Sequence, residues 1–135
     1  MDLDRALAIS AAGLSAQSAR LRIVAENIAN RDSMGQTPGA DPYRRKTITF
    51  ATRLDRALGV ETVRVARIGT DDRPFPERFE PSHPAADARG YVKTPNVDSL
   101  VENMDMREAN RSYNANLAVL ETTRGMLMRA IEALR

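Results

Sequence analysis

Two long proline-free segments with regularly spaced apolar residues flank a middle segment of different character. All seven prolines lie between Pro38 and Pro95. Proline disrupts helix interiors because it lacks a backbone N–H and its ring clashes with the preceding turn. The flanks can therefore form long helices. We divide the chain, as one structural domain, into an N-terminal helix at residues 1–30, a middle segment at 31–95 and a C-terminal helix at 96–135.

The N-terminal flank predicts one helix from about residue 3 to residue 30. Six of eight positions that alternate by four and three residues are apolar, a seam typical of helices that pair along their length. Gly13 lies inside this helix, where glycine costs about 1 kcal/mol. Asn30, followed by Asp32 and Gly35, supplies the expected helix end. The seam positions are Leu3, Leu7, Ser10, Leu14, Gln17, Leu21, Val24 and Ile28.

The C-terminal flank predicts a longer helix, from about residue 98 to residue 134. Asn96 and Asp98 are candidates for its N-cap, and Ser99 with Glu102 fits a capping box. A long apolar seam needs another helix to cover it, so we expect the two terminal helices to pack as a coiled-coil-like pair. Seven of its nine seam positions are apolar, and the exceptions are Asn110 and Arg124. The seam positions are Met106, Asn110, Tyr113, Leu117, Leu120, Arg124, Leu127, Ile131 and Leu134.

The middle segment predicts a small β element with irregular connections. Residues 47–50 and 63–66 alternate as half-buried strands do, and residues 58–60 can turn between them. We expect an irregular or extended loop at residues 71–84 and a last short strand at residues 91–93. The fold class expected from the whole pattern is mainly α, with a small β/loop segment between two long helices.

Composition indicates a chain that shares its stability with partners. Apolar residues make up 42% of the 135 residues, but only 4% are aromatic and tryptophan is absent. Large apolar side chains are therefore scarce for a self-sufficient core.

The 20 basic and 18 acidic residues give a net charge of +2. This near balance argues against the clustered basic face that nucleic-acid-binding proteins usually have. The one basic run, Arg44, Arg45 and Lys46, could bind phosphates, form an exposed strand edge or contact an acidic neighbouring subunit.

The sequence does not supply the side chains of an active site. It has no cysteine and one histidine, His83, which we interpret as a solvated loop residue. No glycine-rich phosphate motif is present, and Asp71 with Asp72 is better explained as a turn. We therefore expect no enzyme activity, cofactor, metal or small-molecule substrate. We also find no signal peptide and no apolar stretch of about 20 residues for membrane insertion, which suggests a cytoplasmic chain or one exported by another route.

Several motifs resemble those of known proteins. Residues 13–17 and 24–30, ending in Ala-Glu-Asn-Ile-Ala-Asn, are similar to the N-terminal signature of flagellar rod, hook and hook-associated axial proteins. Residues 33–35 replace the expected Thr-x-Gly. The insert at residues 36–42, followed by Tyr-Arg-Arg-Lys, resembles the proximal rod members of this family. Residues 90–97 and 104–116 are similar to the family's last strand and helix, although Thr94 departs from the expected aromatic residue.

The resemblance implies a structural subunit of the flagellar basal-body rod. The terminal helices would polymerise with other rod subunits and further copies into a helical tube across the periplasm, after export by the flagellar type III apparatus. A cytoplasmic helical coiled-coil adaptor is the alternative. Asn27 and Asn30 could either contact a neighbour or simply stop the first helix. The residues that we expect at subunit interfaces are Leu7, Leu14, Gln17, Leu21, Asn27, Ile28, Asn30, Arg44, Arg45, Met106, Tyr113, Leu117, Leu120, Leu127 and Ile131.

Overall fold

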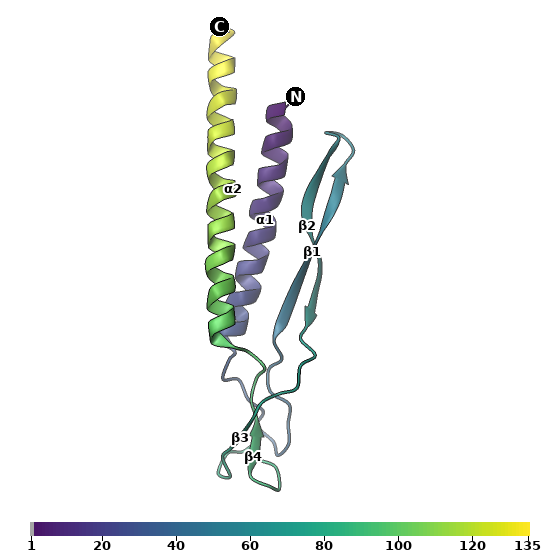
Figure 1. Ribbon diagram of the computed structural model, residues 1–135, viewed down its shortest axis with the longest axis vertical. Helices are drawn as coiled ribbons and strands as arrows, with labels where there is room; N and C mark the ends of the chain where they lie inside the picture. Colours follow the sequence, from purple (N-terminus) through teal and green to yellow (C-terminus); the bar gives the residue numbers. More distant parts are fainter. Residues whose placement is uncertain (1) are drawn as a thin grey trace. The chain divides into compact units, whose positions relative to one another are not determined.

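A computed structural model describes residues 2–135 of the chain (Figure 1). Two long helices lie at the ends of the sequence, and two two-stranded sheets, one long and one short, lie between them. The expected mainly α fold with a small β segment is therefore confirmed. The elements in chain order are α1 (Asp2–Ala29), β1 (Lys46–Asp55), β2 (Val60–Thr70), β3 (Glu77–Phe79), β4 (Tyr91–Lys93) and α2 (Ser99–Ala133).

The chain forms two compact units, and each of them contains part of both helices. The first unit combines α1 as far as Leu21 with Ile48–Arg67 and Arg107–Arg135. The second unit combines Arg22–Thr47 with Ile68–Met106. The first unit thus holds most of the helix pair and of the β1–β2 hairpin. The second unit holds the helix ends, the connecting loops and the β3–β4 sheet.

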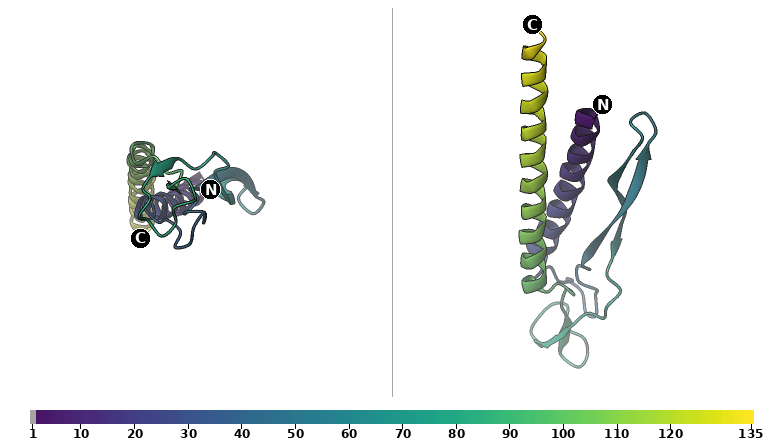
Figure 2. Two further views of the ribbon diagram at one scale, coloured as in Figure 1. Left: turned by 90° about the horizontal axis from the view of Figure 1, so that it is seen from below. Right: turned by 45° about the horizontal axis from the view of Figure 1, so that its top comes forward.

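Small residues form the closest contact between α1 and α2 in the first unit. The helices run side by side (Figure 1 and Figure 2), and a Cβ atom at Gly13 would lie 2.7–2.8 Å from the side-chain atoms of Asn116. Ser10 and Ala16 on α1 and Ala109 on α2 are also buried. The seam leucines are half-buried, except Leu134, which is exposed. Gly13, expected only to weaken the helix, is required by the close approach of its partner.

The β1–β2 hairpin is longer than the sequence pattern indicates. Its strands extend well beyond residues 47–50 and 63–66, although both expected strands are confirmed. The turn is closed by a hydrogen bond of 2.7 Å from the Gly59 amide to the Asp55 carbonyl. Gly59 has a φ of +66°, a conformation that other residues rarely adopt.

The β3–β4 sheet corrects one expectation and confirms another. The strand at residues 91–93 is confirmed as β4, whereas the irregular or extended loop expected at residues 71–84 contains the paired strand β3. The two strands are antiparallel and place Phe79 opposite Tyr91. Because β3 has only three residues, all of them exposed, its sequence carries no alternation of apolar and polar positions. Its extended form depends on pairing with β4.

The ends of the helices differ in part from expectation. The first helix ends at Ala29, which confirms the predicted stop. The side-chain amide of Asn30 donates to the Glu26 carbonyl at 2.9 Å. Asp98 caps α2, because its carboxylate accepts from the Leu100 amide at 3.0 Å. The capping box of Ser99 and Glu102 is wrong: the Glu102 carboxylate is engaged by Arg45 and an asparagine of α1 instead.

The two helix-interior glycines should respond in opposite ways to alanine. A Cβ at Gly125 would meet only an arginine nitrogen at 3.6 Å, so Gly125→Ala should stabilise the chain by about 0.5–1 kcal/mol through helix propensity. Gly13→Ala should lose that gain or destabilise the chain, because the Asn116 side chain must move. Thermal unfolding followed by circular dichroism measures both effects. The prediction fails if both alanines stabilise equally, and adding Asn116→Ala should restore the gain at Gly13.

Candidate functional site

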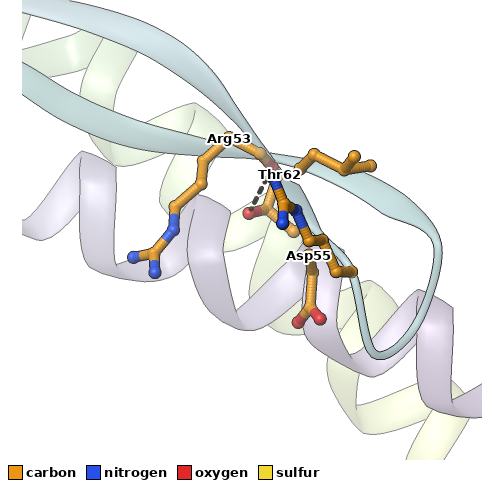
Figure 3. A pocket seen from close by; sticks show the side chains of 5 residues that line it. Arg53, Asp55 and Thr62 are labelled. Carbon is orange, nitrogen blue, oxygen red and sulfur yellow. Dashed lines mark hydrogen bonds between the residues drawn. The ribbon is translucent and has the colours of Figure 1, made fainter.

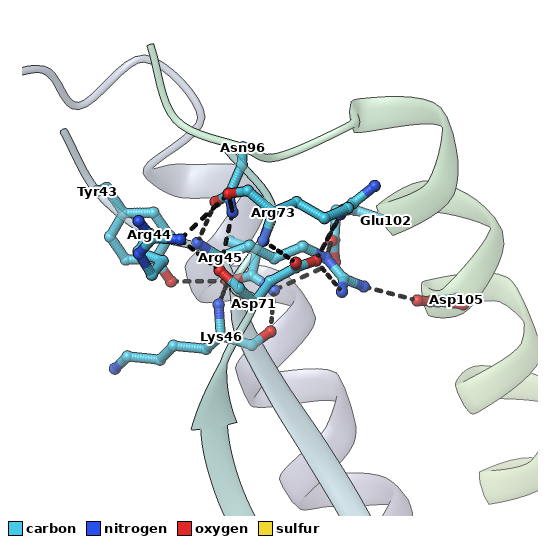
Figure 4. Close-up of polar contacts among 10 residues, drawn as sticks. Tyr43, Arg44, Arg45, Lys46, Asp71, Arg73, Asn96, Glu102 and Asp105 are labelled. Atoms are coloured by element: carbon cyan, nitrogen blue, oxygen red, sulfur yellow. Dashed lines mark hydrogen bonds and ion pairs between the residues drawn. The ribbon is translucent and has the colours of Figure 1, made fainter. Parts of the chain in front are cut away.

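The second unit contains a dense set of polar side chains that we name the Arg45 network (Figure 4). Its members come from the last turns of α1, the start of β1, the loop after β2 and the first turns of α2. This set brings together residues that are far apart in the sequence. The members are Glu26, Asn27, Tyr43, Arg44, Arg45, Lys46, Asp71, Arg73, Asn96, Glu102 and Asp105.

A buried ion pair between Arg45 and Glu102 forms the centre of the network. The Glu102 side chain is fully buried, and its Oε1 accepts a hydrogen bond from Arg45 Nε. The same guanidinium lies 3.4 Å from the Asp71 carboxylate and 3.5 Å from that of Asp105. Arg45 is thus the shared cation of three acidic groups. A buried charge is tolerated only when it is paired and hydrogen-bonded in this way.

Asn27 connects α1 to the start of β1 through a fully satisfied amide. Its Nδ2 donates to the Lys46 carbonyl at 2.9 Å and to Glu102 Oε2 at 3.3 Å. Its Oδ1 accepts from the Tyr43 hydroxyl at 2.7 Å and from the Lys46 amide at 2.9 Å. Asn27 is only 1% exposed. It therefore does not act as a helix stop, and its polar atoms are all engaged inside the chain.

Asn96 fastens the loop after β2 to the start of β1. Its Oδ1 accepts from the Arg45 amide at 2.7 Å, and its Nδ2 donates to the carbonyls of Asp71 and Arg73 at 3.0 and 3.1 Å. Arg44 adds a donor to the Asp71 carbonyl at 2.6 Å and lies over the Phe75 ring, 4.1 Å from its centroid. Asn96 is therefore a loop clamp, and its expected role as an N-cap candidate is wrong.

Local charges shift the pKa values of several network groups. The Arg73 side chain and amide both donate to Asp71, and these bonds lower the pKa of its carboxyl to about 2. The ion pair of 2.9 Å between Lys46 and Glu26 lowers the pKa of Glu26 and raises that of Lys46. Burial raises the pKa of the Tyr43 hydroxyl. All these shifts favour the charge states that hold the network together near neutral pH.

The network has the geometry of a structural clamp. Within residues 2–135, no group of three or more acidic, histidine or cysteine side chains is arranged to hold a metal ion.

A separate hollow at the end of the β1–β2 hairpin is lined by Arg53, Asp55 and Thr62, among others. There the Arg53 and Asp55 side chains point apart (Figure 3). Neither helix of the described chain has an apolar stretch that could cross a membrane.

The structure places the residues expected at subunit interfaces in three situations. Asn27 is buried in the network, and Ile131 is 53% exposed. The others are half-buried, and among them Arg44 and Arg45 are engaged inside the chain. Their role between subunits remains a prediction. The half-buried residues are Leu7, Leu14, Gln17, Leu21, Ile28, Asn30, Arg44, Arg45, Met106, Tyr113, Leu117, Leu120 and Leu127.

Sequence reasoning missed Asp71, Asn96 and Glu102 as members of a common site. One signal was available, because Glu102 lies four residues before Met106 and thus on the same side of α2 as the seam. A charged residue that is buried on that side needs a partner of opposite charge. The choice of Arg45 as that partner depends on the tertiary structure.

Removal of the Glu102 carboxylate should destabilise the second unit strongly. Glu102→Ala leaves Arg45 without its closest partner and should cost about 3 kcal/mol, since breaking a buried pair costs more than the pair contributes. Arg45→Met combined with Glu102→Leu should cost clearly less than the sum of Arg45→Met alone and Glu102→Leu alone. Urea unfolding of the wild type, these two single variants and the double variant gives this cycle. Glu108→Ala is the matched control, because its pair with Arg20 is exposed and 3.5 Å long. Additive effects at Arg45 and Glu102 would contradict the assignment.

Asp71 should make the folded chain sensitive to acid. Its carboxyl pKa of about 2 lies below the ordinary value of 3.8, so its contribution is complete above about pH 4 and is lost as the pH falls towards 2. Across that interval the free energy of unfolding of the wild type should fall by about 1–2 kcal/mol more than that of Asp71→Asn. Urea unfolding at several pH values measures this difference. Parallel curves for the two proteins would show that Asp71 carries no such linkage.

Comparison with known proteins gives relatives along almost the whole chain. The flagellar basal-body rod protein FlgC of Agrobacterium fabrum is 54% identical over 133 residues, which cover 98% of this chain and 96% of that protein. FlgC of Salmonella typhimurium is 42% identical over 125 residues, covering 91% of each chain. FlgC of Bacillus subtilis is 36% identical over 141 residues, covering 93% of this chain and 94% of that protein.

The C-terminal part also matches a wider family of axial proteins. Residues 88–133, which contain β4 and α2, match the family described as flagellar basal body rod FlgEFG protein C-terminal. The resemblance inferred from the helix motifs is thereby confirmed, including its proximal-rod subgroup. The pair of long terminal helices agrees with this assignment. The chain belongs to the FlgC family of flagellar basal-body rod proteins.

Proposed function

We propose that this chain assembles with other rod subunits, including further copies of itself, through the half-buried seams of its terminal helices. As a member of the FlgC family it is a structural protein of the flagellar basal-body rod and not an enzyme. The assembly would be a helical tube that transmits torque across the periplasm. The alternative of a cytoplasmic adaptor is set aside by the family membership.

The small core of the isolated chain supports assembly most directly. The buried hydrophobic residues of the described chain include no leucine, methionine or phenylalanine, and half of them are alanine. A self-sufficient domain normally buries its leucines, and large apolar surfaces left open mark interaction sites. Covering the seam leucines in an assembly would supply the missing burial. The buried hydrophobic residues are Ala16, Ile23, Val24, Ala85, Val92 and Ala109.

We further infer that the flagellar type III export apparatus is a partner of the chain before assembly. The sequence contains no cysteine, so refolding after passage in an unfolded form requires no disulfide formation. The small core also favours this route, because little buried apolar area has to be exposed when the chain unfolds for export. Entry into an oxidising compartment would likewise leave the chain chemically unchanged.

Copurification tests the proposed function. A tagged copy that restores swimming to a strain lacking the gene should be found in purified basal bodies, in stoichiometric amounts with the other rod proteins. Complete absence of the chain from basal bodies of swimming cells would overturn the proposal.

Charges placed in the seams should block assembly. Leu21→Asp and Leu120→Asp each put a carboxylate into a half-buried apolar seam, where it would become buried without a partner on assembly. Each variant should abolish swimming in soft agar and be missing from basal bodies. Thr52→Asp on an exposed position of β1 is the matched control and should swim normally. Normal swimming of both leucine variants would show that the seams do not face other subunits.

A further inference from the structure

The β1–β2 hairpin carries the entire net charge of the chain. We name its part in the first unit, Ile48–Arg67, the hairpin arm. The arm contains four of the chain's 20 basic residues and two of its 18 acidic ones, so its charge equals the net charge of +2. The other segments together are therefore neutral. The charged residues of the arm are Arg53, Asp55, Arg56, Glu61, Arg64 and Arg67.

Three of the four arginines lie on one side of the arm or in its turn. Thr62 Oγ1 donates to the Arg53 carbonyl at 3.3 Å, which places these two residues across from each other. Side chains alternate between the two sides of a strand, so Arg64 shares the side of Thr62. Arg56 lies in the turn between the strands. We name Arg53, Arg56 and Arg64 the arginine face.

One acidic residue belongs to the same side as the arginine face. Asp55 lies two positions after Arg53 on β1, and its carboxylate accepts from the Ala57 and Leu58 amides at 3.0 and 3.3 Å. It thus serves the turn of its own hairpin. Glu61 and Arg67 lie on the opposite side of β2 from Thr62 and balance each other there. The positive charge of the arm is therefore concentrated on the arginine face.

The guanidinium groups of the arginine face are exposed, and none of them forms an ion pair with another residue in the range 2–135. Arg53 and Arg56 line the hollow at the end of the hairpin, where the Arg53 side chain extends away from Asp55 (Figure 3). A guanidinium group binds a carboxylate through two parallel N–H donors. The hollow thus offers donors for which its own chain supplies no acceptor within the described residues.

A second copy of the chain does not offer an acidic surface to match. Outside the arm, most acidic side chains already form ion pairs with basic residues of their own chain. The others are scattered, and Glu121 and Glu132 on α2 each lie within one helical turn of an exposed arginine. The paired acidic residues are Glu26, Asp32, Asp41, Asp71, Glu77, Glu80, Asp87, Glu102, Asp105 and Glu108.

The extent of the arginine face favours a protein over a membrane as the source of negative charge. At about 3.3 Å per residue, Arg64 lies roughly 13 Å along β2 from its first residue, Val60. The face therefore runs from the tip of the arm along its side. A flat lipid surface would reach only the tip, whereas a protein surface can follow both parts.

We propose that the arginine face binds an acidic surface of a protein other than this chain. This inference rests on the proposed function, because the contact would form within the basal body. Carboxylates of the partner would occupy the hollow beside Arg53 and Arg56 and extend along the arm to Arg64. Arginine is enriched among the residues that dominate binding energy, and complementary charge fixes the orientation in which two proteins dock.

Lysine replacements can detect this contact, because carbodiimide joins lysine amines, but not arginine, to carboxylates that touch them. Arg53→Lys and Arg64→Lys, made one at a time, keep the positive charge and introduce a reactive amine. The native Lys46 and Lys93 pair with carboxylates of their own chain. Treatment of purified basal bodies should join residue 53 or 64 to an aspartate or glutamate of a different protein, identified by mass spectrometry. Thr52→Lys, exposed on the other side of β1, is the matched control and should give roughly ten-fold less product.

The remaining outcomes of the cross-linking experiment decide between the proposal and its competitors. A link to a second copy of this chain, or no link while both variants are present in basal bodies, would overturn the contact and leave the proposed function standing. Binding of the wild-type chain to phosphatidylglycerol vesicles that is lost in Arg53→Glu with Arg64→Glu would assign the face to a lipid surface and overturn the proposal. Absence of the wild-type chain from basal bodies would overturn the proposed function itself.

Charge reversal separates docking from folding. Arg53→Glu combined with Arg64→Glu changes two exposed side chains, so circular dichroism should show unchanged helicity and thermal unfolding. Incorporation into basal bodies should fall roughly ten-fold, because the acidic partner then meets like charge. Arg53→Lys combined with Arg64→Lys should retain incorporation. Normal incorporation of the reversed variant would show that these arginines only keep the strand edges from pairing with other chains.

Discussion

The buried carboxylate of Glu102 is the constraint on which the second unit depends. Glu102 belongs to α2, and its side chain is fully buried. The carboxylate accepts hydrogen bonds from the Arg45 guanidinium and from the Asn27 side-chain amide. A buried charge costs several kcal/mol unless its partners are placed well, so one arrangement of the connected segments is strongly favoured over others. The last turns of α1, the start of β1 and the first turns of α2 are thereby fixed to one another.

The first unit depends on close packing of small side chains. Gly13 and its neighbours on α1 allow α2 to approach until the Asn116 amide occupies the space of a Cβ atom. This contact aligns the two long helices while little apolar area is buried between them. All seam leucines except the exposed Leu134 stay half-buried. A chain built in this way has a defined fold and an open apolar surface at the same time. Both properties suit a subunit that completes its core by contact with neighbours.

The sequence pattern predicted the parts of the fold that are set by local physics. The absence of proline and the four–three spacing predicted both helices to within a residue or so at each end, and the alternation at residues 47–50 and 63–66 located both long strands. Asn30 and Asp98 could be recognised at helix ends because their side chains bond to nearby backbone groups. The three residues of β3 could not be recognised, since their extended form depends on hydrogen bonds to a strand twelve or more residues away.

The sequence by itself determined the family, the helical fold and the scarcity of large core residues, because motifs, periodicity and composition are local properties of the chain. It did not determine what its polar residues do. Asn27, Asn96 and Glu102 each carry a pattern that fits a helix terminus, yet all three bind in the Arg45 network. Only the tertiary structure decided this, because a polar side chain bonds to the partner that folding brings within about 3 Å. Arg45, 57 residues before Glu102, is such a partner.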